Sequence, residues 1–260
     1  MDLFGLTAAQ FETFVLVLVR VSTILFMIPI FSASQIPLQV RFGLGLTISF
    51  VVYHVVPTIA PLDGLGALTS AVFCQAMVGL VFGFVSFLVF TGVQFAGAVL
   101  DIEVGFSVVN VINPLSGETV SVLGELELAL ATLIYLISNA HHYLFEGMAG
   151  SFNLVPLPFI AVQPTLQNDV SAFFARSLLL VFQIAAPVVI ALFLVNIGLA
   201  LMARVAPQLN VFAIGFPLQI LVGLGMIVLT LPLLVVVLPQ VFGETPRELD
   251  TVLRLLRAPG

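Results

Sequence analysis

The sequence predicts an all-α, polytopic membrane protein with about six hydrophobic segments, arranged as broken helices and hairpins. Apolar residues make up 61% of the 260 residues and charged residues 8%, whereas a soluble domain is typically about 45–50% apolar and about 25% charged. A soluble domain of this length still exposes about a quarter of its chain surface, so it could not hide this much apolar surface. The apolar residues form long unbroken runs, which indicate helices, and not the alternating segments of about ten residues found in a transmembrane β-barrel.

Six charge-poor runs define the segments. The third is far longer than the roughly 20 helical residues that cross the hydrocarbon core, so it is either one long tilted helix or a broken pair. Thr7 and Gln10 have capping-box spacing just before the first run, and Gly215-Phe216-Pro217 predicts a turn before the main helix of the sixth. The runs are Phe11 to Phe31, Phe42 to Leu62, Gly64 to Leu100, Leu128 to Phe145, Ser177 to Ala203 and Val205 to Gly243.

The C-terminal tail is a different kind of element. Thr245 and Glu248 have capping-box spacing, with Pro246 at the first helical position. The apolar side chains that follow fall on one helix face; they are Leu249, Val252, Leu253 and Leu256. We expect an integral-membrane helical domain over residues 1–243 and an amphipathic tail over 244–260, which could lie on the membrane or dock on a partner.

The charges and the cysteine content exclude several classes of protein. The net charge is −6, with seven Arg, no Lys and thirteen acids, so the chain lacks the basic patch that a nucleic-acid binder needs. Cys74 is the only cysteine, which rules out an intrachain disulfide and a multi-cysteine metal site. Asp2 and Glu12 stand where a signal peptide would carry basic residues, so we expect the first segment to be retained.

The pattern of polar residues does not predict catalysis. No Ser/His/Asp arrangement, phosphate-binding loop or metal cluster is visible, and we expect a non-enzymatic protein with no cofactor and no metal. His141 and His142 are adjacent and point to different sides of a helix, whereas metal-binding histidines on a helix stand at i and i+4. They therefore indicate a polar helix end.

Arg20 is the clearest charge within a predicted span, where charges are costly and often functional. Glu12 is about two helical turns away, which is too far for an easy direct contact. A partner from another segment or another chain is one interpretation. An arginine near a membrane face whose charged end reaches the water is the other, and the sequence leaves both open.

Gly79 and Gly83 form a GxxxG pair within the third run. Because this spacing lets two helix backbones approach closely, the pair predicts a helix-packing face, within the chain or with a partner.

The segment from Asp101 to Glu127 is the most unusual. It carries five acids and no basic residue, and Asn113-Pro114 followed by Ser116-Gly117 is a strong turn signal. It is either an ordinary external loop or a re-entrant loop that lines a water-filled cavity, where non-helical backbone is tolerated at membrane depth.

The stretch from Asn196 to Leu218 reads NIGLALMARVAPQLNVFAIGFPL. It resembles the signature of the FliR family, whose counterpart in virulence type III secretion is SctT, and two Pro-punctuated turns at a fixed offset make the match specific. The signature residues are Asn196, Arg204, Ala206, Pro207, Gln208, Leu209, Asn210, Gly215, Phe216 and Pro217.

Two shorter stretches agree with this resemblance. Ile36-Pro37 with Arg41 is similar to the family's first loop, and Gly105-Phe106-Ser107 is similar to the start of its central loop. The family often has Asp where this chain has Asn113. Length and segment order match over essentially the whole chain.

The resemblance implies a subunit of the flagellar type III protein export gate in the bacterial inner membrane. In the family, one such chain joins several copies of FliP and FliQ in a helical, pore-forming hetero-oligomer that conducts unfolded proteins, and it also contacts FlhB. The family's helices are expected to sit partly above the bilayer plane, so that their apolar faces meet partner subunits more than lipid.

The same resemblance implies that the central loop plugs the closed pore. By position, the plug would consist of Phe106, Ser107, Val108, Val109, Asn110, Val111, Ile112, Asn113, Pro114, Leu115, Ser116 and Gly117.

Two other functions stay open at this stage. A stand-alone small-solute transporter or channel often shows paired halves and ionisable residues at the midplane, and no internal repeat is evident here. An intramembrane hydrolase would depend on one of the few polar residues within the spans.

Overall fold

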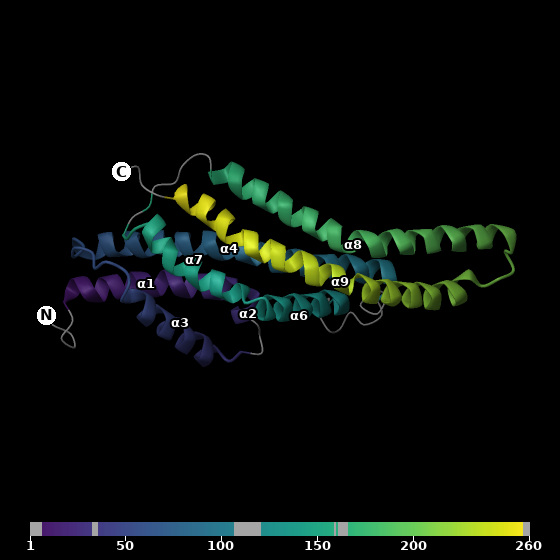
Figure 1. The fold of residues 1–260 in the computed structure, drawn as a ribbon, viewed down its shortest axis with the longest axis horizontal. Coiled ribbons are helices and arrows are strands. Elements are labelled where there is room, and N and C mark those ends of the chain that lie inside the picture. Colours follow the sequence, from purple (N-terminus) through teal and green to yellow (C-terminus); the bar gives the residue numbers. More distant parts are fainter. Residues whose placement is uncertain (1–6, 33–35, 107–120, 159, 161–165, 257–260) are drawn as a thin grey trace. The chain divides into compact units, whose positions relative to one another are not determined.

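The structure is a computed structural model that describes residues 7–32, 36–106, 121–158, 160 and 166–256. Every regular element within these ranges is a helix, which confirms the predicted fold class (Figure 1). The helices are α1 (Ala8–Met27), α2 (Pro29–Ser32), α3 (Leu38–Tyr53), α4 (Gly64–Val104), α6 (Val122–Ile137), α7 (Ala140–Leu154), α8 (Leu166–Val205) and α9 (Val211–Arg254). Thr7 and Gln10 form the predicted capping box at the start of α1.

Four helices are long and apolar enough to cross a membrane: α1, α4, α8 and α9. The pair α6 and α7 qualifies as a fifth if it counts as one span, although a break bends it by 75°. The expected second segment gives a shorter helix, because α3 has 16 residues and ends at Tyr53. Pro57 and Pro61 follow it, and the residue before a proline is disfavoured in helical geometry.

The third run forms one continuous helix, α4, and not a broken pair. The predicted turn at Gly215-Phe216-Pro217 is wrong, since these residues lie within the first two turns of α9. The chain reverses at residues 206–210 instead, where Asn210 accepts the Ala213 backbone N–H at 3.3 Å through its side-chain oxygen. Such a bond is typical of an N-cap, and it fixes the start of α9 ahead of Pro217.

The helix predicted to begin at Thr245 also starts elsewhere, because α9 continues through Thr245 and Pro246 to Arg254. The apolar face of the tail is buried, with Leu249, Val252, Leu253 and Leu256 at most 3% exposed. The division of the chain at residue 244 stays a prediction.

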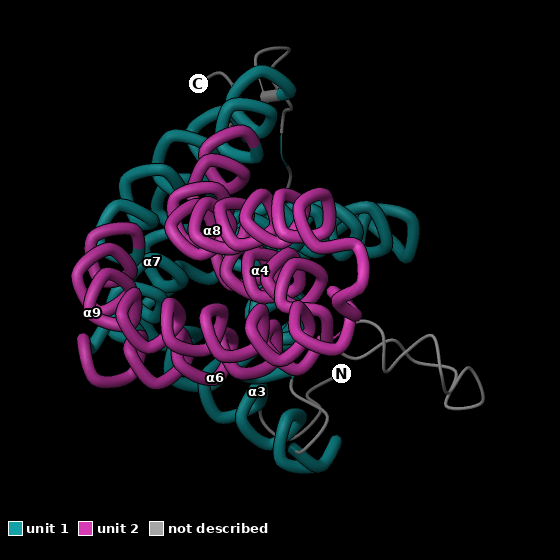
Figure 2. Tube along the Cα trace, turned by 90° about the vertical axis from the view of Figure 1, so that its right-hand side faces the viewer, with its two compact units in different colours: residues 1–88, 139–174, 242–260 teal, residues 89–138, 175–241 magenta. Residues whose placement is uncertain are grey.

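The chain forms two compact units (Figure 2). Unit 1 comprises Met1–Leu88, Asn139–Phe174 and Phe242–Gly260, and unit 2 comprises Val89–Ser138 and Ala175–Val241. In unit 1, α1 packs on α3 through edge-to-face contacts of Phe14 with Tyr53 and of Phe26 with Phe42.

Gly79 and Gly83 face α1 within unit 1. A Cβ on Gly79 would lie 2.7 Å from the Thr23 Cβ, and a Cβ on Gly83 would lie 2.5 Å from the Met27 Cβ. Both distances are shorter than the non-bonded contacts that Cβ atoms make in proteins. A larger residue at either position would therefore push the two helices apart.

In unit 2, the last part of α4 lies against three other helices. A Cβ on Gly97 would meet the backbone of Gly124 on α6, and one on Gly92 would lie 3.3 Å from the Ser177 carbonyl oxygen on α8. On α9, a Cβ on Gly223 would lie 2.5 Å from the Val104 Cγ2. This part of α4, which leads into the central loop, is therefore held on several sides.

Candidate functional site at the base of the central loop

Of the twelve residues predicted to form the plug, Phe106 is described, and Ser107 to Gly117 lie outside the described residues. The two flanks of the loop are described. On one side α4 ends at Val104, and Gly105 follows with φ +95°, a backbone conformation that favours glycine. On the other side Ser121 precedes α6. The site is therefore defined by the base that carries the loop.

The helices α4 and α6 touch backbone to backbone at this base. A Cβ on Gly97 would lie 2.6 Å from the Gly124 Cα, and a Cβ on Gly124 would lie 2.9 Å from the Gln94 carbonyl oxygen. Beside this contact, the Gln94 side chain donates a hydrogen bond from Nε2 to the Glu125 Oε1 at 2.9 Å. Glycine at both positions is what lets the two helices approach so closely.

The start of α6 is capped twice. The Ser121 Oγ accepts the Gly124 backbone N–H at 2.8 Å, as an N-cap side chain does. Asp101, which is 5% exposed and lies on α4, accepts the Leu123 backbone N–H at 3.1 Å through Oδ1. Because a carboxylate is stabilised near a helix N-terminus, Asp101 fixes the beginning of α6 to the end of α4.

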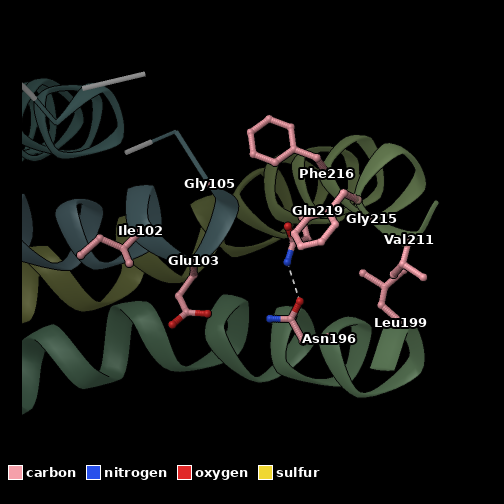
Figure 3. Close-up of a pocket in the computed structure, with 10 residues that line it drawn as sticks. Ile102, Glu103, Gly105, Asn196, Leu199, Val211, Gly215, Phe216 and Gln219 are labelled. Carbon is pink, nitrogen blue, oxygen red and sulfur yellow. Dashed lines mark hydrogen bonds between the residues drawn. The ribbon is translucent and has the colours of Figure 1, made fainter. Parts of the chain in front are cut away.

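A cavity of about 380 Å³ lies beside this base, within unit 2 (Figure 3). Its walls come from the end of α4, from α8 and from α9. Three residues of the family signature line it, namely Asn196, Gly215 and Phe216. The Gln219 side chain donates from Nε2 to the Asn196 Oδ1 across the facing sides of α8 and α9.

Phe216 also lies against the end of α4. A Cβ on Gly105 would be 2.9 Å from the Phe216 Cε2. The structure therefore brings Phe216 of the family signature next to Gly105 at the flank of the central loop, although 111 residues separate the two in the sequence. Among the other signature residues, Arg204 lies on α8, Ala206 to Asn210 form the turn between the helices, and Pro217 lies on α9.

The acids of the central region take different places. Glu103 lines the cavity, and no hydrogen bond or ion pair joins it to any described residue. Glu127 on α6 is 4% exposed, and its Oε2 has no hydrogen-bond partner among the described residues. Glu118 lies outside the described residues. The region predicted from the sequence as one acidic loop therefore contributes to a helix cap, a cavity wall and a buried position.

Unit 1 holds a second polar cluster, around Arg20. Its side chain is fully buried and donates to the Gln75 Oε1, to the Ser151 carbonyl oxygen at 3.0 Å and to the Val155 carbonyl oxygen at 2.8 Å. Glu12 accepts the Leu62 backbone N–H at 2.8 Å instead. Of the two interpretations, the structure supports partners from other segments and not an arginine that reaches the water.

Sequence reasoning did not identify the contact between Gly97 and Gly124 or the capping role of Asp101. A glycine within a long apolar run could also mark a bend, whereas α4 is continuous at Gly97. The available signals were weak: Ser121 stands at a helix start, and small residues occur on both sides of the loop.

Together, the membrane-length helices and the fixed loop base define a polytopic helical membrane protein. Residues 11–245 match the model of a family described as Bacterial export proteins, family 1. The Flagellar biosynthetic protein FliR of Bacillus subtilis (strain 168) is 32% identical over 251 residues, which cover 95% of this chain and 96% of that protein. The protein of the same name from Escherichia coli (strain K12) is 31% identical over 231 residues, covering 87% of each chain.

The chain therefore belongs to the FliR family of bacterial export proteins. This confirms the resemblance that the signature from Asn196 to Pro217 indicated.

Proposed function

We propose that this chain is a non-enzymatic subunit of the flagellar type III protein export gate in the bacterial inner membrane. In this proposal it joins FliP and FliQ subunits in a hetero-oligomer and contacts FlhB. It helps to form and to close a pore through which unfolded proteins leave the cell. The family membership of the chain and the names of its relatives supply the flagellar context.

The observation that supports a subunit role most directly is the apolar surface that the chain leaves uncovered. In the most apolar stretch of α9, 17% of the residues are buried, against 50% for α4. Large apolar side chains along α8 and α9 are exposed, and Phe212 is 91% exposed. Exposed apolar patches of this extent mark contacts with other proteins or with lipid. Packing against neighbouring subunits in an assembly would cover this surface.

The base of the central loop supports a role in closing the pore. A segment that plugs a channel must be held in place at both of its ends. Here Asp101 and the paired glycines Gly97 and Gly124 join the two flanks of the loop. In the proposed mechanism, Phe106 to Gly117 plug the pore, and this base keeps the plug at the pore axis while the gate is closed.

The experiment that tests the subunit role is purification of the tagged chain from membranes of a flagellated host. We expect it to co-purify with FliP and FliQ subunits in one large particle. A monodisperse chain on its own that binds a small solute would instead support the stand-alone transporter and overturn the proposal.

A further inference from the structure

The cavity beside the loop base has the chemistry of a site for a cation. Glu103 from α4, Asn196 from α8 and Gln219 from α9 line it, and in Figure 3 the Glu103 side chain points toward the side of Asn196, while the Phe216 ring extends the other way, past Gly105. We propose that this cavity binds a basic side chain that a neighbouring subunit of the assembly inserts. The inference rests on the proposed function, because it requires that the chain work within a complex.

Glu103 supplies the charge. The residue is half-buried at the cavity wall, which Ile102 and Leu199 also line, and within the described part of the chain nothing pairs with its carboxylate. The described basic residues of unit 2, Arg176 and Arg204, do not line the cavity. A carboxylate in such surroundings is stabilised by a charge-assisted hydrogen bond from a cation, and the cation must come from outside this unit.

The amide pair supplies a further acceptor. Because Gln219 uses its N–H to donate to Asn196, the Gln219 Oε1 remains available. If both amides were flipped, the Asn196 oxygen would be available instead, so one acceptor remains in either case. The end of α4, where the Gly105 N–H closes the last helical bond onto the Asp101 carbonyl oxygen at 3.1 Å, adds the partial negative charge of a helix C-terminus.

The cavity has room for a long basic side chain, since its volume is about 380 Å³. An arginine would bind the Glu103 carboxylate through two parallel hydrogen bonds, and a lysine would bring its charge as a point.

The surroundings of the cavity favour a neighbouring subunit as the source of this side chain. Phe212 lines the cavity and is 91% exposed, so the site opens onto apolar surface that the chain itself leaves uncovered. A partner helix that covers this surface would bring the basic residue to the same place in every complex. Exported chains differ in sequence, and a cavity with fixed acceptors would hold some of them and not others.

The test compares Glu103→Gln and Glu103→Arg with the matched control Glu146→Gln, which makes the same chemical change at an exposed position on α7. Each tagged variant is expressed in the flagellated host, and the co-purified subunits are quantified after a wash at high salt. We expect the Gln variant to lose about tenfold of its partner, as the loss of one desolvated ion pair implies, and the Arg variant to lose more. The control should match the unmodified chain.

Suppressors of Glu103→Arg identify the source of the basic side chain. We expect restored motility to map to a basic-to-acidic change in another subunit. Normal co-purification of both Glu103 variants would overturn the inference. Slower export with intact assembly would also overturn it, because the basic group would then belong to the exported chain. Failure of the unmodified chain to co-purify with any subunit would instead defeat the proposed function, so the two failures are distinguishable.

Discussion

Arg20 and Gln75 are joined by two hydrogen bonds in a site that excludes water. The Arg20 Nε donates to the Gln75 Oε1 at 2.8 Å, and Nη2 donates to the same oxygen. Gln75 also bonds to a third segment, because its Nε2 donates to the Pro158 carbonyl oxygen at 2.7 Å. Both side chains are fully buried, so α1 and α4 are linked to the segment after α7 through one polar chain of contacts.

The guanidinium uses its whole donor set in this cluster. Five bonds leave its nitrogens, to the Gln75 side chain, to the Ser151 carbonyl and hydroxyl oxygens and to the Val155 carbonyl oxygen. The Phe152 ring lies 4.1 Å from the Arg20 Cζ. Ser151 and Val155 stand at the C-terminal end of α7, where a cation is stabilised by the partial charge of the helix. The buried cation is therefore stabilised by neutral hydrogen-bond acceptors, by an aromatic ring and by the C-terminal end of a helix.

We predict that Arg20→Met destabilises unit 1. The substitution leaves the Gln75 side chain and the Val155 carbonyl without their donor, and each buried group left unpaired costs about 1–3 kcal/mol. Arg20→Lys should restore little, because an ammonium has three donors and cannot reproduce the planar arrangement. The measurement is the temperature at which half of the detergent-solubilised protein leaves its monodisperse peak.

Arg254→Met is the matched control for this prediction. Arg254 pairs with Asp250 at 2.8 Å on the exposed surface, and exposed pairs contribute little. A midpoint for Arg20→Met equal to that of Arg254→Met would contradict the structural role of the cluster.

Local signals and distant contacts explain what the sequence could and could not predict. The capping box of Thr7 and the apolar runs that form α1, α4, α8 and α9 depend on neighbouring residues, and these were predicted correctly. The partners of Arg20 include Gln75 and Ser151. These residues are distant in the sequence, and no periodic pattern predicts that they contact Arg20. The turn was misplaced because Pro207 and Pro217 carry the same local signal, and the cap made by Asn210 decides between them.

The base of the loop shows the same limit. Gly97 and Gly124 are unremarkable in an apolar sequence rich in glycine, and their meaning appears when α4 and α6 lie side by side. Asp101 was visible as one of five acids in a segment without basic residues. Its function as a cap for α6 depends on a hydrogen bond from the Leu123 backbone N–H, and the whole central loop separates these two residues in the sequence.

We predict that Gly97→Ala loosens the base of the loop. The new methyl group would lie 2.6 Å from the Gly124 Cα, and a helix backbone cannot yield as a flexible side chain can. Overpacking of this kind costs about 1–3 kcal/mol. Proteolysis of the folded complex at the central loop should therefore become faster.

Gly198→Ala provides the comparison, since nothing lies within 4 Å of a Cβ at that position of α8. It should leave the cleavage rate unchanged. Equal cleavage of the Gly97 and Gly198 variants would show that the contact between α4 and α6 does not control the loop.

We predict that Gly79→Leu and Gly83→Leu prevent normal assembly, with the cause lying within the chain. The leucine side chain would meet Thr23 or Met27 of α1, so unit 1 must change before any subunit contact does. The expected result is less chain in the purified complex and a lower thermal midpoint for the chain by itself. Gly66→Leu on the same helix, where a Cβ meets nothing within 4 Å, should assemble normally.

Recovery of the full complex with either of these two variants would defeat the packing prediction. Loss of assembly with an unchanged thermal midpoint would contradict its cause instead, and would assign the glycines to a contact with another subunit.

The plug assignment leads to the last prediction. Replacing Phe106 to Gly117 by a Gly/Ser linker of the same length removes the side chains proposed to close the pore. The base remains, because Asp101, Leu123 and the two glycines are untouched. Ion leak through the assembled complex, measured in liposomes, should rise while the subunit composition stays the same. An assembled complex with the linker and an unchanged leak would exclude this segment as the plug. A leak that rises equally with the linker and with Gly97→Ala would show instead that closure depends on how the base holds the loop, since the second variant keeps every plug residue.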